Sequence, residues 1–168
     1  MKEHRSFHPW YEGMWHLRYV SDGKTLWEED IQNTLVNEGE KNVLNSYFRN
    51  TESPTTFYAR LCRDSLIESS TLNTISNEPS STYGYAPCTI ERSATGWPTI
   101  EVDSLDWRVV SKEISWTASG GDIGPVNTCF LATSSDNTGL LIAYLNLPVE
   151  RTILDGDTLY AYLRVKAK

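Results

Sequence analysis

The sequence has little of several features that define common classes of protein. Its 168 residues contain three cysteines and three histidines, and 15 Lys and Arg face 22 Asp and Glu for a net charge of −7. Cys62, Cys88 and Cys129 are widely spaced and show no C-x-x-C grouping, so we expect reduced thiols in or beside strands rather than disulfides or a zinc site. The acidic balance argues against nucleic acid as a main partner, because backbone phosphates require clustered Lys and Arg.

Long apolar runs and catalytic motifs are also missing. No apolar run approaches the roughly 18 residues that a membrane helix needs, and we expect neither a signal peptide nor a membrane partner. There is no Walker loop, no G-x-G-x-x-G and no G-x-S-x-G elbow. The histidines His4, His8 and His16 all precede Leu17, which leaves few ligands for a metal site or a Ser-His-Asp triad. We therefore predict no cofactor, no metal and no enzyme activity.

Two pairs of carboxylates remain as candidates for glycoside hydrolysis. Asp103 and Asp106 precede Trp107, and Asp155 and Asp157 flank Gly156. Both pairs lie in segments typical of turns, where Asp side chains hydrogen-bond to the backbone. We expect this structural role, and a glycoside hydrolase is the most distant alternative.

The residues that are present indicate a chain built mainly of strands. Hydrophobic residues make up 39%, with six Trp and nine Tyr, which suits a large core or contact surface. Alternation and turn signals predict strands over 14–20, 25–31, 56–63, 89–92, 99–102, 107–117, 126–133, 140–147 and 158–166. Ser21-Asp22-Gly23-Lys24 is typical of a hairpin turn, and 64–82 of a long surface loop. The spacing favours an antiparallel jelly-roll-like β-sandwich.

One segment predicts a short helix near the N-terminal third of the chain. Asn37 suits an N-cap, and Glu40 three residues later resembles a capping box. Four apolar residues then share one face at helical spacing, and we expect that face to dock on the core: Val43, Leu44, Tyr47 and Phe48. The expected organisation is a single domain, 1–168, with a flexible N-terminal arm (1–9), a hairpin (10–31), the helix (36–48) and the β-sandwich (56–168).

The order of these segments resembles a known family. Asn33 to Asn45 (N-T-L-V-N-E-G-E-K-N-V-L-N), the strand Thr56–Arg63, Tyr83-Gly84-Tyr85-Ala86 and Leu154-Asp155-Gly156-Asp157-Thr158-Leu159 are similar, in order and spacing, to segments of small structural proteins of tailed bacteriophages. The resemblance extends over most of the chain. It implies a sandwich fold of the same kind and a non-enzymatic virion protein, assembled in the host cytoplasm.

Within this class the resemblance favours a capsid decoration or cement protein. Its expected partners are the major capsid protein or other virion proteins, and a homo-oligomer, a trimer by analogy with jelly-roll cement proteins. A tail or tail-adaptor component is the alternative within the class. A carbohydrate-binding module for host attachment is the alternative from another class, with a sugar-stacking set drawn from five aromatic residues: Tyr83, Tyr85, Trp97, Trp107 and Trp116.

The aromatic residues after the arm are candidates for an interface. Trp10, Tyr11 and Trp15 are bulky side chains close to the N-terminal arm. Large aromatic residues serve cores and interfaces alike, so these rings either close the end of the core or anchor a neighbouring subunit.

Overall fold

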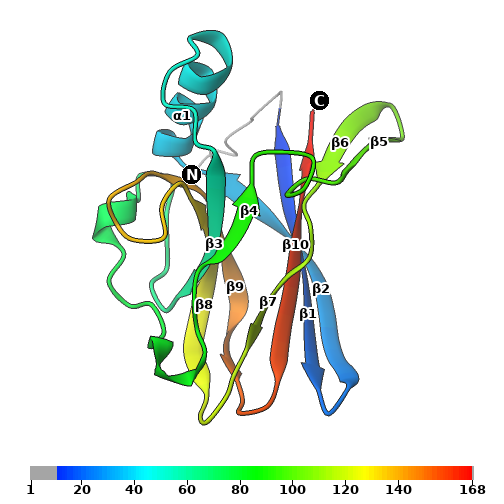
Figure 1. The fold of residues 1–168 in the computed structure, drawn as a ribbon, viewed down its shortest axis with the longest axis vertical. Coiled ribbons are helices and arrows are strands. Elements are labelled where there is room, and N and C mark those ends of the chain that lie inside the picture. The colour runs from blue at the N-terminus through cyan, green and yellow to red at the C-terminus, as the bar shows by residue number, and fades with distance from the viewer. Residues whose placement is uncertain (1–10, 168) are drawn as a thin grey trace, which may run out of the picture.

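The chain folds into ten strands and one α-helix over residues 11–167, which the computed structural model describes (Figure 1). The helix α1 (Asn37–Phe48) follows the first two strands, and the prediction of a mainly β chain with one helix is confirmed. The strands are β1 (Glu12–Ser21), β2 (Lys24–Leu35), β3 (Thr56–Cys62), β4 (Cys88–Glu91), β5 (Thr99–Asp103), β6 (Asp106–Val110), β7 (Ile114–Thr117), β8 (Ile123–Ala132), β9 (Leu141–Ile153) and β10 (Thr158–Lys166).

The strands form one curled antiparallel sheet in the order β4-β3-β8-β9-β2-β1-β10-β6-β5, with β7 also paired to β10. The long strand β2 joins the two halves, because it pairs with β1 up to Asn33 and then with β9 through Thr34 and Leu35. The curl brings β4 close to β7, where the Cys88 thiol lies 3.3 Å from the carbonyl oxygen of Ser115.

The core lies between the two halves of this curled sheet. Alternate residues of β1, namely Trp15, Leu17 and Tyr19, point inward and are buried. Leu61 on β3 and Leu145 on β9 belong to the same cluster from the other half. The hairpin turn that the sequence predicts joins β1 to β2, with positive φ at Asp22 and Gly23 as a type I′ turn requires.

A second, smaller core lies on the outer face of β8 and β9. The segment 63–87 contains the surface loop that the sequence predicts over 64–82, and it buries Leu66, Leu72 and Ile75 against Phe130 and Leu141. The expectation of a loop is correct for its irregular backbone, which contains only two 3₁₀ turns. It is wrong for its exposure, because a few isolated apolar residues without periodicity are enough to cover one face of a sheet.

A buried ion pair fastens this segment to the sheet. Arg60 on β3 is buried and pairs with Glu78 from the long loop. Its guanidinium also donates to the carbonyl oxygen of Asp136 at 2.7 Å and to Asn137 Oδ1 at 2.8 Å, on the β8–β9 turn. The Tyr85 hydroxyl donates to Glu78 Oε2 at 2.7 Å, so both carboxylate oxygens of Glu78 have hydrogen-bond partners inside the fold.

The helix α1 exists where the sequence predicts it, but it docks through a different face. The residue before it, Val36, has no side chain that caps the helix, and Asn37 is its exposed first residue rather than its cap. The buried helix residues are Gly39, Asn42 and Asn45. The predicted docking face is exposed, which corrects the expectation for all four of its members: Val43, Leu44, Tyr47 and Phe48.

Close backbone approach and polar contacts explain this choice of face. A Cβ at Gly39 would lie 2.1 Å from the carbonyl oxygen of Ile142, so only glycine lets the helix approach β9 this closely. Asn42 donates to the carbonyl oxygen of Glu52 at 2.7 Å, and Asn45 donates to the Glu52 carboxylate at 2.9 Å. These contacts turn the polar side of α1 inward.

The predicted strand over 107–117 is two strands. β6 and β7 are separated by residues 111–113, and Ser111 still binds β10: its backbone N–H donates to the carbonyl oxygen of Leu163 at 2.8 Å. The Leu163 N–H in turn donates to the Ser111 hydroxyl at 2.9 Å. Beyond this point β6 and β5 form a hairpin that extends past the end of the curled sheet (Figure 1).

The three cysteines carry free thiols. Cys62 and Cys129 are buried and Cys88 is half-buried. Burial raises the pKa of the Cys62 thiol to about 12 and that of the Cys88 thiol to about 11. These thiols therefore stay protonated at neutral pH and behave as small apolar groups.

Candidate functional site

The described part of the chain contains no group of three or more His, Cys, Asp or Glu residues placed to hold a metal. His16 lies on β1, with Nδ1 2.8 Å from Asp30 Oδ1 and Nε2 2.9 Å from Glu28 Oε1. Its ring stacks on Tyr162 at a centroid distance of 4.5 Å. His4 and His8 lie outside the described residues.

The first pair of candidate carboxylates belongs to an ion-pair cluster beneath the β5–β6 hairpin. Asp103 lies 3.4 Å from Arg108 and 3.6 Å from Lys166, and Asp106 lies 3.4 Å from Lys166. Each carboxylate is therefore compensated by a cation. Glycoside hydrolysis needs a pair of carboxyl groups available to the sugar, and these two are engaged in ion pairs of the hairpin.

The second pair lies in the β9–β10 turn. Asp155 accepts from the backbone N–H of Gly120 at 2.7 Å, and Asp157 accepts from the Tyr19 hydroxyl at 2.6 Å. Hydrogen bonds from Ser21 and Tyr19 hold the pKa of Asp157 below its usual range. Both carboxylates are thus structural groups of a turn, as the sequence predicts.

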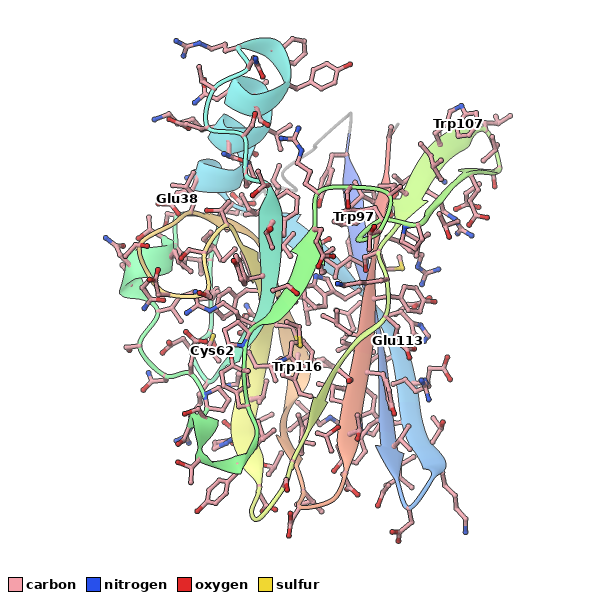
Figure 2. All side chains as sticks on the ribbon, viewed as in Figure 1. Glu38, Cys62, Trp97, Trp107, Glu113 and Trp116 are labelled. Carbon is pink, nitrogen blue, oxygen red and sulfur yellow. The ribbon has the colours of Figure 1, made fainter. Side chains whose placement is uncertain are left out.

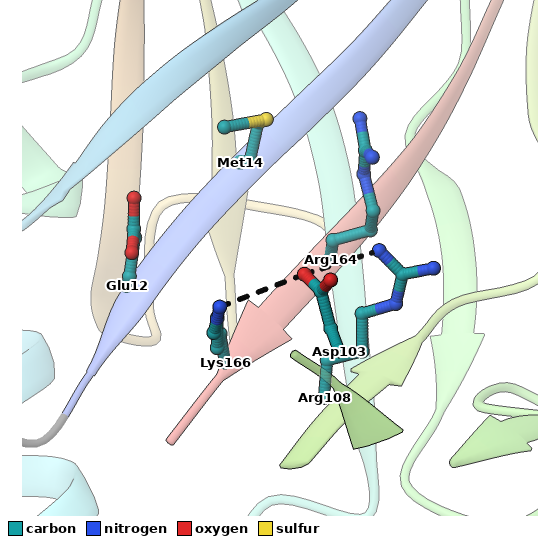
Figure 3. Close-up of a pocket in the computed structure, with 6 residues that line it drawn as sticks. All are labelled: Glu12, Met14, Asp103, Arg108, Arg164 and Lys166. Carbon is teal, nitrogen blue, oxygen red and sulfur yellow. Dashed lines mark hydrogen bonds and ion pairs between the residues drawn. The ribbon is translucent and has the colours of Figure 1, made fainter. Parts of the chain in front are cut away.

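A small pocket lies where the hairpin meets β1 and β10 (Figure 3). Its volume is about 120 Å³, below the roughly 300 Å³ at which ligand pockets begin. Asp103 pairs with Arg108 and Lys166 across the pocket. The lining residues are charged apart from one apolar residue: Glu12, Met14, Asp103, Arg108, Arg164 and Lys166. Arg164 also pairs with Asp30 at 2.5 Å. The pocket lies at the contact between the β5–β6 hairpin and the strands β1 and β10.

The three interface candidates from the sequence lie in different situations. Trp15 is fully buried in the core, so its side chain is not available to a partner. Tyr11 is half-buried and packs against the same core, and burial raises the pKa of its hydroxyl. Trp10 lies outside the described residues, as does the arm, 1–9.

The aromatic residues suggested for sugar stacking do not share an exposed face. Tyr85 and Trp116 are buried, and their polar atoms bond inside the fold: the Trp116 indole N–H donates to the carbonyl oxygen of Ala86 at 3.0 Å. Tyr83 and Trp107 are exposed, but they lie far apart in the fold. Figure 2 shows Trp116 inside the curled sheet and Trp107 on the projecting hairpin. This geometry disfavours a stacking platform built from that set.

Two groups of exposed apolar side chains lie at the end of the molecule that carries α1 and the β5–β6 hairpin (Figure 1), and others, such as Leu26, Ile67 and Leu154, lie elsewhere. We call Val43, Leu44 and Tyr47 on α1 the helix patch, and Ile100, Val102, Leu105 and Trp107 the hairpin patch. Apolar side chains that are exposed in groups, rather than singly, are typical of surfaces that bind a partner.

Sequence reasoning found the residues of the helix patch but placed them in the core, and of the hairpin patch it named only Trp107 as a binding candidate, in the sugar-stacking set. One signal was present: the turn sequence Asp-Ser-Leu-Asp puts Leu105, an apolar residue, where turns usually carry polar residues or glycine.

Comparisons with protein families, with curated proteins and with solved structures find no match to this chain. Among the described residues, no helix is long and apolar enough to cross a membrane.

Proposed function

We propose that this chain is a non-enzymatic structural protein of a tailed-bacteriophage virion, and more specifically a capsid decoration or cement protein that stabilises the shell from outside. One observation carries the proposal. Two groups of exposed apolar side chains, on α1 and on the β5–β6 hairpin, lie at one end of the fold, whereas the described carboxylates considered as catalytic groups are occupied in turns and ion pairs. An assembly protein needs the first feature and has no use for free catalytic groups.

The resemblance of the ordered segments to small phage structural proteins supplies the class. The proposal includes the jelly-roll-like sandwich that the resemblance implies. In its support, the sheet halves β4-β3-β8-β9 and β1-β10-β7 face each other across a shared core, with β2 passing from one to the other. The two faces of a sandwich have the same relation.

Multivalency explains how a small protein with modest contacts serves as cement. A closed shell presents many identical sites, so weak contacts at each site add up when an oligomer engages several at once. The proposed partners are the major capsid protein or other virion proteins, and the proposed oligomer is a trimer by analogy. The place of action is the virion, after assembly in the host cytoplasm.

The test is co-sedimentation of purified protein with shells of the virus assembled without it, followed by heating. Intact protein should sediment with the shells and raise their disruption temperature, whereas an unrelated acidic protein of similar mass should do neither. If the protein sediments with tails and ignores shells, it is a tail or tail-adaptor component. If it binds neither and is retained on a polysaccharide column, the carbohydrate-binding alternative replaces the proposal.

A truncated protein tests the expectation placed on the N-terminal arm. If residues 1–9 form the flexible arm that the sequence predicts, removing them should leave the far-UV circular dichroism and the unfolding midpoint unchanged. If the arm reaches a neighbour, the truncated protein should no longer sediment with shells. Unchanged sedimentation would show that the arm plays no part in binding.

A further inference from the structure

The dipeptide Asp-Gly occurs twice in the sequence, each time in a turn between two strands. Asp22-Gly23 joins β1 to β2, and Asp155-Gly156 joins β9 to β10. All four residues are exposed. The carboxyl carbon of an aspartate and the backbone nitrogen of the next residue are close neighbours along the chain, and a following glycine has no Cβ to restrict the rotation that brings them together.

These neighbours can react with each other, and water is the only other reactant. The glycine nitrogen attacks the aspartate carboxyl carbon, and the carboxyl hydroxyl leaves with the amide proton as water, which gives a five-membered cyclic imide. A water molecule then opens the ring at one of its two carbonyl carbons. Opening at the side-chain carbon restores aspartate, whereas opening at the main-chain carbon gives isoaspartate, whose backbone runs through the former side chain. One water is lost and one is gained, and no electrons are transferred.

Hydrogen bonds hold both reacting groups of the second pair in place. The Asp155 carboxylate accepts from the backbone N–H of Gly120 at 2.7 Å. The Gly156 N–H, whose nitrogen would be the nucleophile, donates to the carbonyl oxygen of Ala118 at 3.0 Å. The Asp155 N–H donates to Asp122 Oδ1 at 2.8 Å, which fixes the backbone of the turn as well. The bonds on the carboxylate and on the nucleophilic nitrogen must break before the ring closes.

The reacting groups of the first pair carry no such restraint. Among the described residues, the Asp22 carboxylate has no hydrogen-bond or ion-pair partner, and the Gly23 N–H donates to no backbone carbonyl oxygen. Asp22 also has a positive φ of 47°, which a residue with a Cβ adopts at a cost in free energy. A departure from this turn conformation is therefore opposed less at Asp22 than at Asp155.

We propose that Asp22-Gly23 is a site of spontaneous backbone modification, at which the folded chain forms isoaspartate through the cyclic imide, and that the fold protects Asp155-Gly156 from the same reaction. The two pairs share their chemistry and their exposure. They differ in the hydrogen bonds on the carboxylate and on the nucleophilic nitrogen. Two hydrogen bonds of typical net strength should slow the reaction at Asp155 by about ten- to a hundredfold relative to Asp22.

The modification changes the β1–β2 turn and leaves the rest of the fold in place. Isoaspartate inserts one further atom into the main chain, and the chain keeps its mass and its number of carboxylates. Tyr19 holds the strands beyond the turn, because its ring stacks on Trp27 of β2 at a centroid distance of 5.8 Å and its hydroxyl donates to Asp157 at 2.6 Å. The turn lies at the end of the molecule opposite α1 (Figure 1), away from the helix patch and the hairpin patch.

The experiment incubates the full-length protein at physiological temperature, once folded in neutral buffer and once unfolded in concentrated guanidinium chloride. No shells are present, so the outcome is independent of the proposed function. Trypsin then releases each Asp-Gly pair in its own peptide, 19–24 and 152–164, by cleavage after arginine or lysine. An isoaspartyl peptide has the mass of its parent, but it has a different retention time in reversed-phase chromatography and different fragments after electron transfer. The second peptide is the internal control for the first.

In the folded protein, isoaspartate should accumulate at Asp22 about ten- to a hundredfold faster than at Asp155. In the unfolded protein the two rates should be similar, because the hydrogen bonds of the turns are absent and glycine follows in both pairs. Asp22→Ser removes the reacting carboxyl group, so the modified form of the first peptide should disappear in this variant while the second peptide behaves as in the wild type.

Three results would overturn the proposal. The first is a folded protein that forms no isoaspartate at Asp22 over a period in which the unfolded protein forms it, because the β1–β2 turn would then be protective. The second is an equal rate at Asp22 and Asp155 in the folded protein. The third is a difference between the two sites that persists unchanged in the unfolded protein, because the local sequence and not the fold would then be its cause.

Discussion

Removing the carboxylate of Glu78 should destabilise the fold strongly, because it leaves the buried guanidinium of Arg60 without its counter-charge. In Glu78→Ala the guanidinium keeps the carbonyl oxygen of Asp136 and the side chain of Asn137 as acceptors. The guanidinium loses its ion pair with Glu78, and the Arg60 side chain is only 3% exposed. Breaking a buried pair from one side costs about 3–5 kcal/mol, and we expect a value in this range.

The free energy of unfolding can be measured by urea titration and by thermal melting. For a chain of this size each kcal/mol lowers the melting temperature by about 2–4 °C, so Glu78→Ala should melt roughly 6–20 °C below the wild type. The matched control is Glu150→Ala, which breaks the exposed pair between Arg63 and Glu150 at 3.4 Å. That variant should change stability by about 1 kcal/mol or less.

The comparison of Glu78→Ala with Glu150→Ala shows whether the buried ion pair holds the segment 63–87 on the sheet. If Glu78→Ala costs no more than Glu150→Ala, the ion pair does not fasten the segment 63–87, and the second core is held by its apolar contacts alone. A smaller loss of stability accompanied by a reduced urea m-value would have a different meaning. It would show that the segment detaches while the main core stays folded.

Two further predictions concern the packing of α1 and the loss of stability at acid pH. Gly39→Ala should destabilise by about 1–3 kcal/mol in urea titration, since its Cβ would lie 2.1 Å from the carbonyl oxygen of Ile142; an unchanged midpoint would contradict the close packing of α1 on β9. Hydrogen bonds from Ser134 and Thr138 hold the pKa of Asp136 at about 2. The stability that these hydrogen bonds add is present above the pKa of Asp136 in the unfolded chain, near 4, and is lost as the pH falls toward 2. Asp136→Asn should therefore flatten the pH dependence of the free energy of unfolding between about pH 4 and pH 2. An unchanged slope in this range would refute the prediction.

The sequence predicts the elements of this fold better than their environment. Periodicity identified β1, its turn and the helix, because alternation and the 3.6-residue repeat are local properties of the chain. The repeat that groups Leu44 with Tyr47 shows that they share a face and does not show what that face meets. Gly39 and Asn42 decide this through backbone approach and hydrogen bonds to Ile142 and Glu52, which lie elsewhere in the chain.

The exposure of the hairpin patch could not be predicted from the sequence for the same reason. The alternation of Ile100 and Val102 with Glu101 predicts a strand with one apolar face, and such a face normally packs on the core. Here the carboxylates of the β5–β6 hairpin pair with Arg108 and Lys166 on the side that faces β10, and the apolar face of the hairpin is exposed to solvent. The pairing of β2 with both β1 and β9, which curls the sheet, is also a long-range property that no local pattern contains.

Leu44 and Leu61 are the same residue type in opposite situations, and together they test the helix patch. Leu61 is fully buried in the main core, so Leu61→Ala should cost about 2–5 kcal/mol at every protein concentration. Leu44 is half exposed, so Leu44→Ala should cost about 0.5 kcal/mol or less in dilute protein.

If the helix patch takes part in the proposed homo-oligomer, the cost of Leu44→Ala should grow as the protein concentration of the titration rises, because association stabilises only the folded chain and the variant weakens that association. The measurement is the unfolding midpoint of the wild type and both variants over a series of protein concentrations. A cost for Leu44→Ala that equals that of Leu61→Ala in dilute protein would place Leu44 in a packed interior. The helix patch would then not exist as a surface.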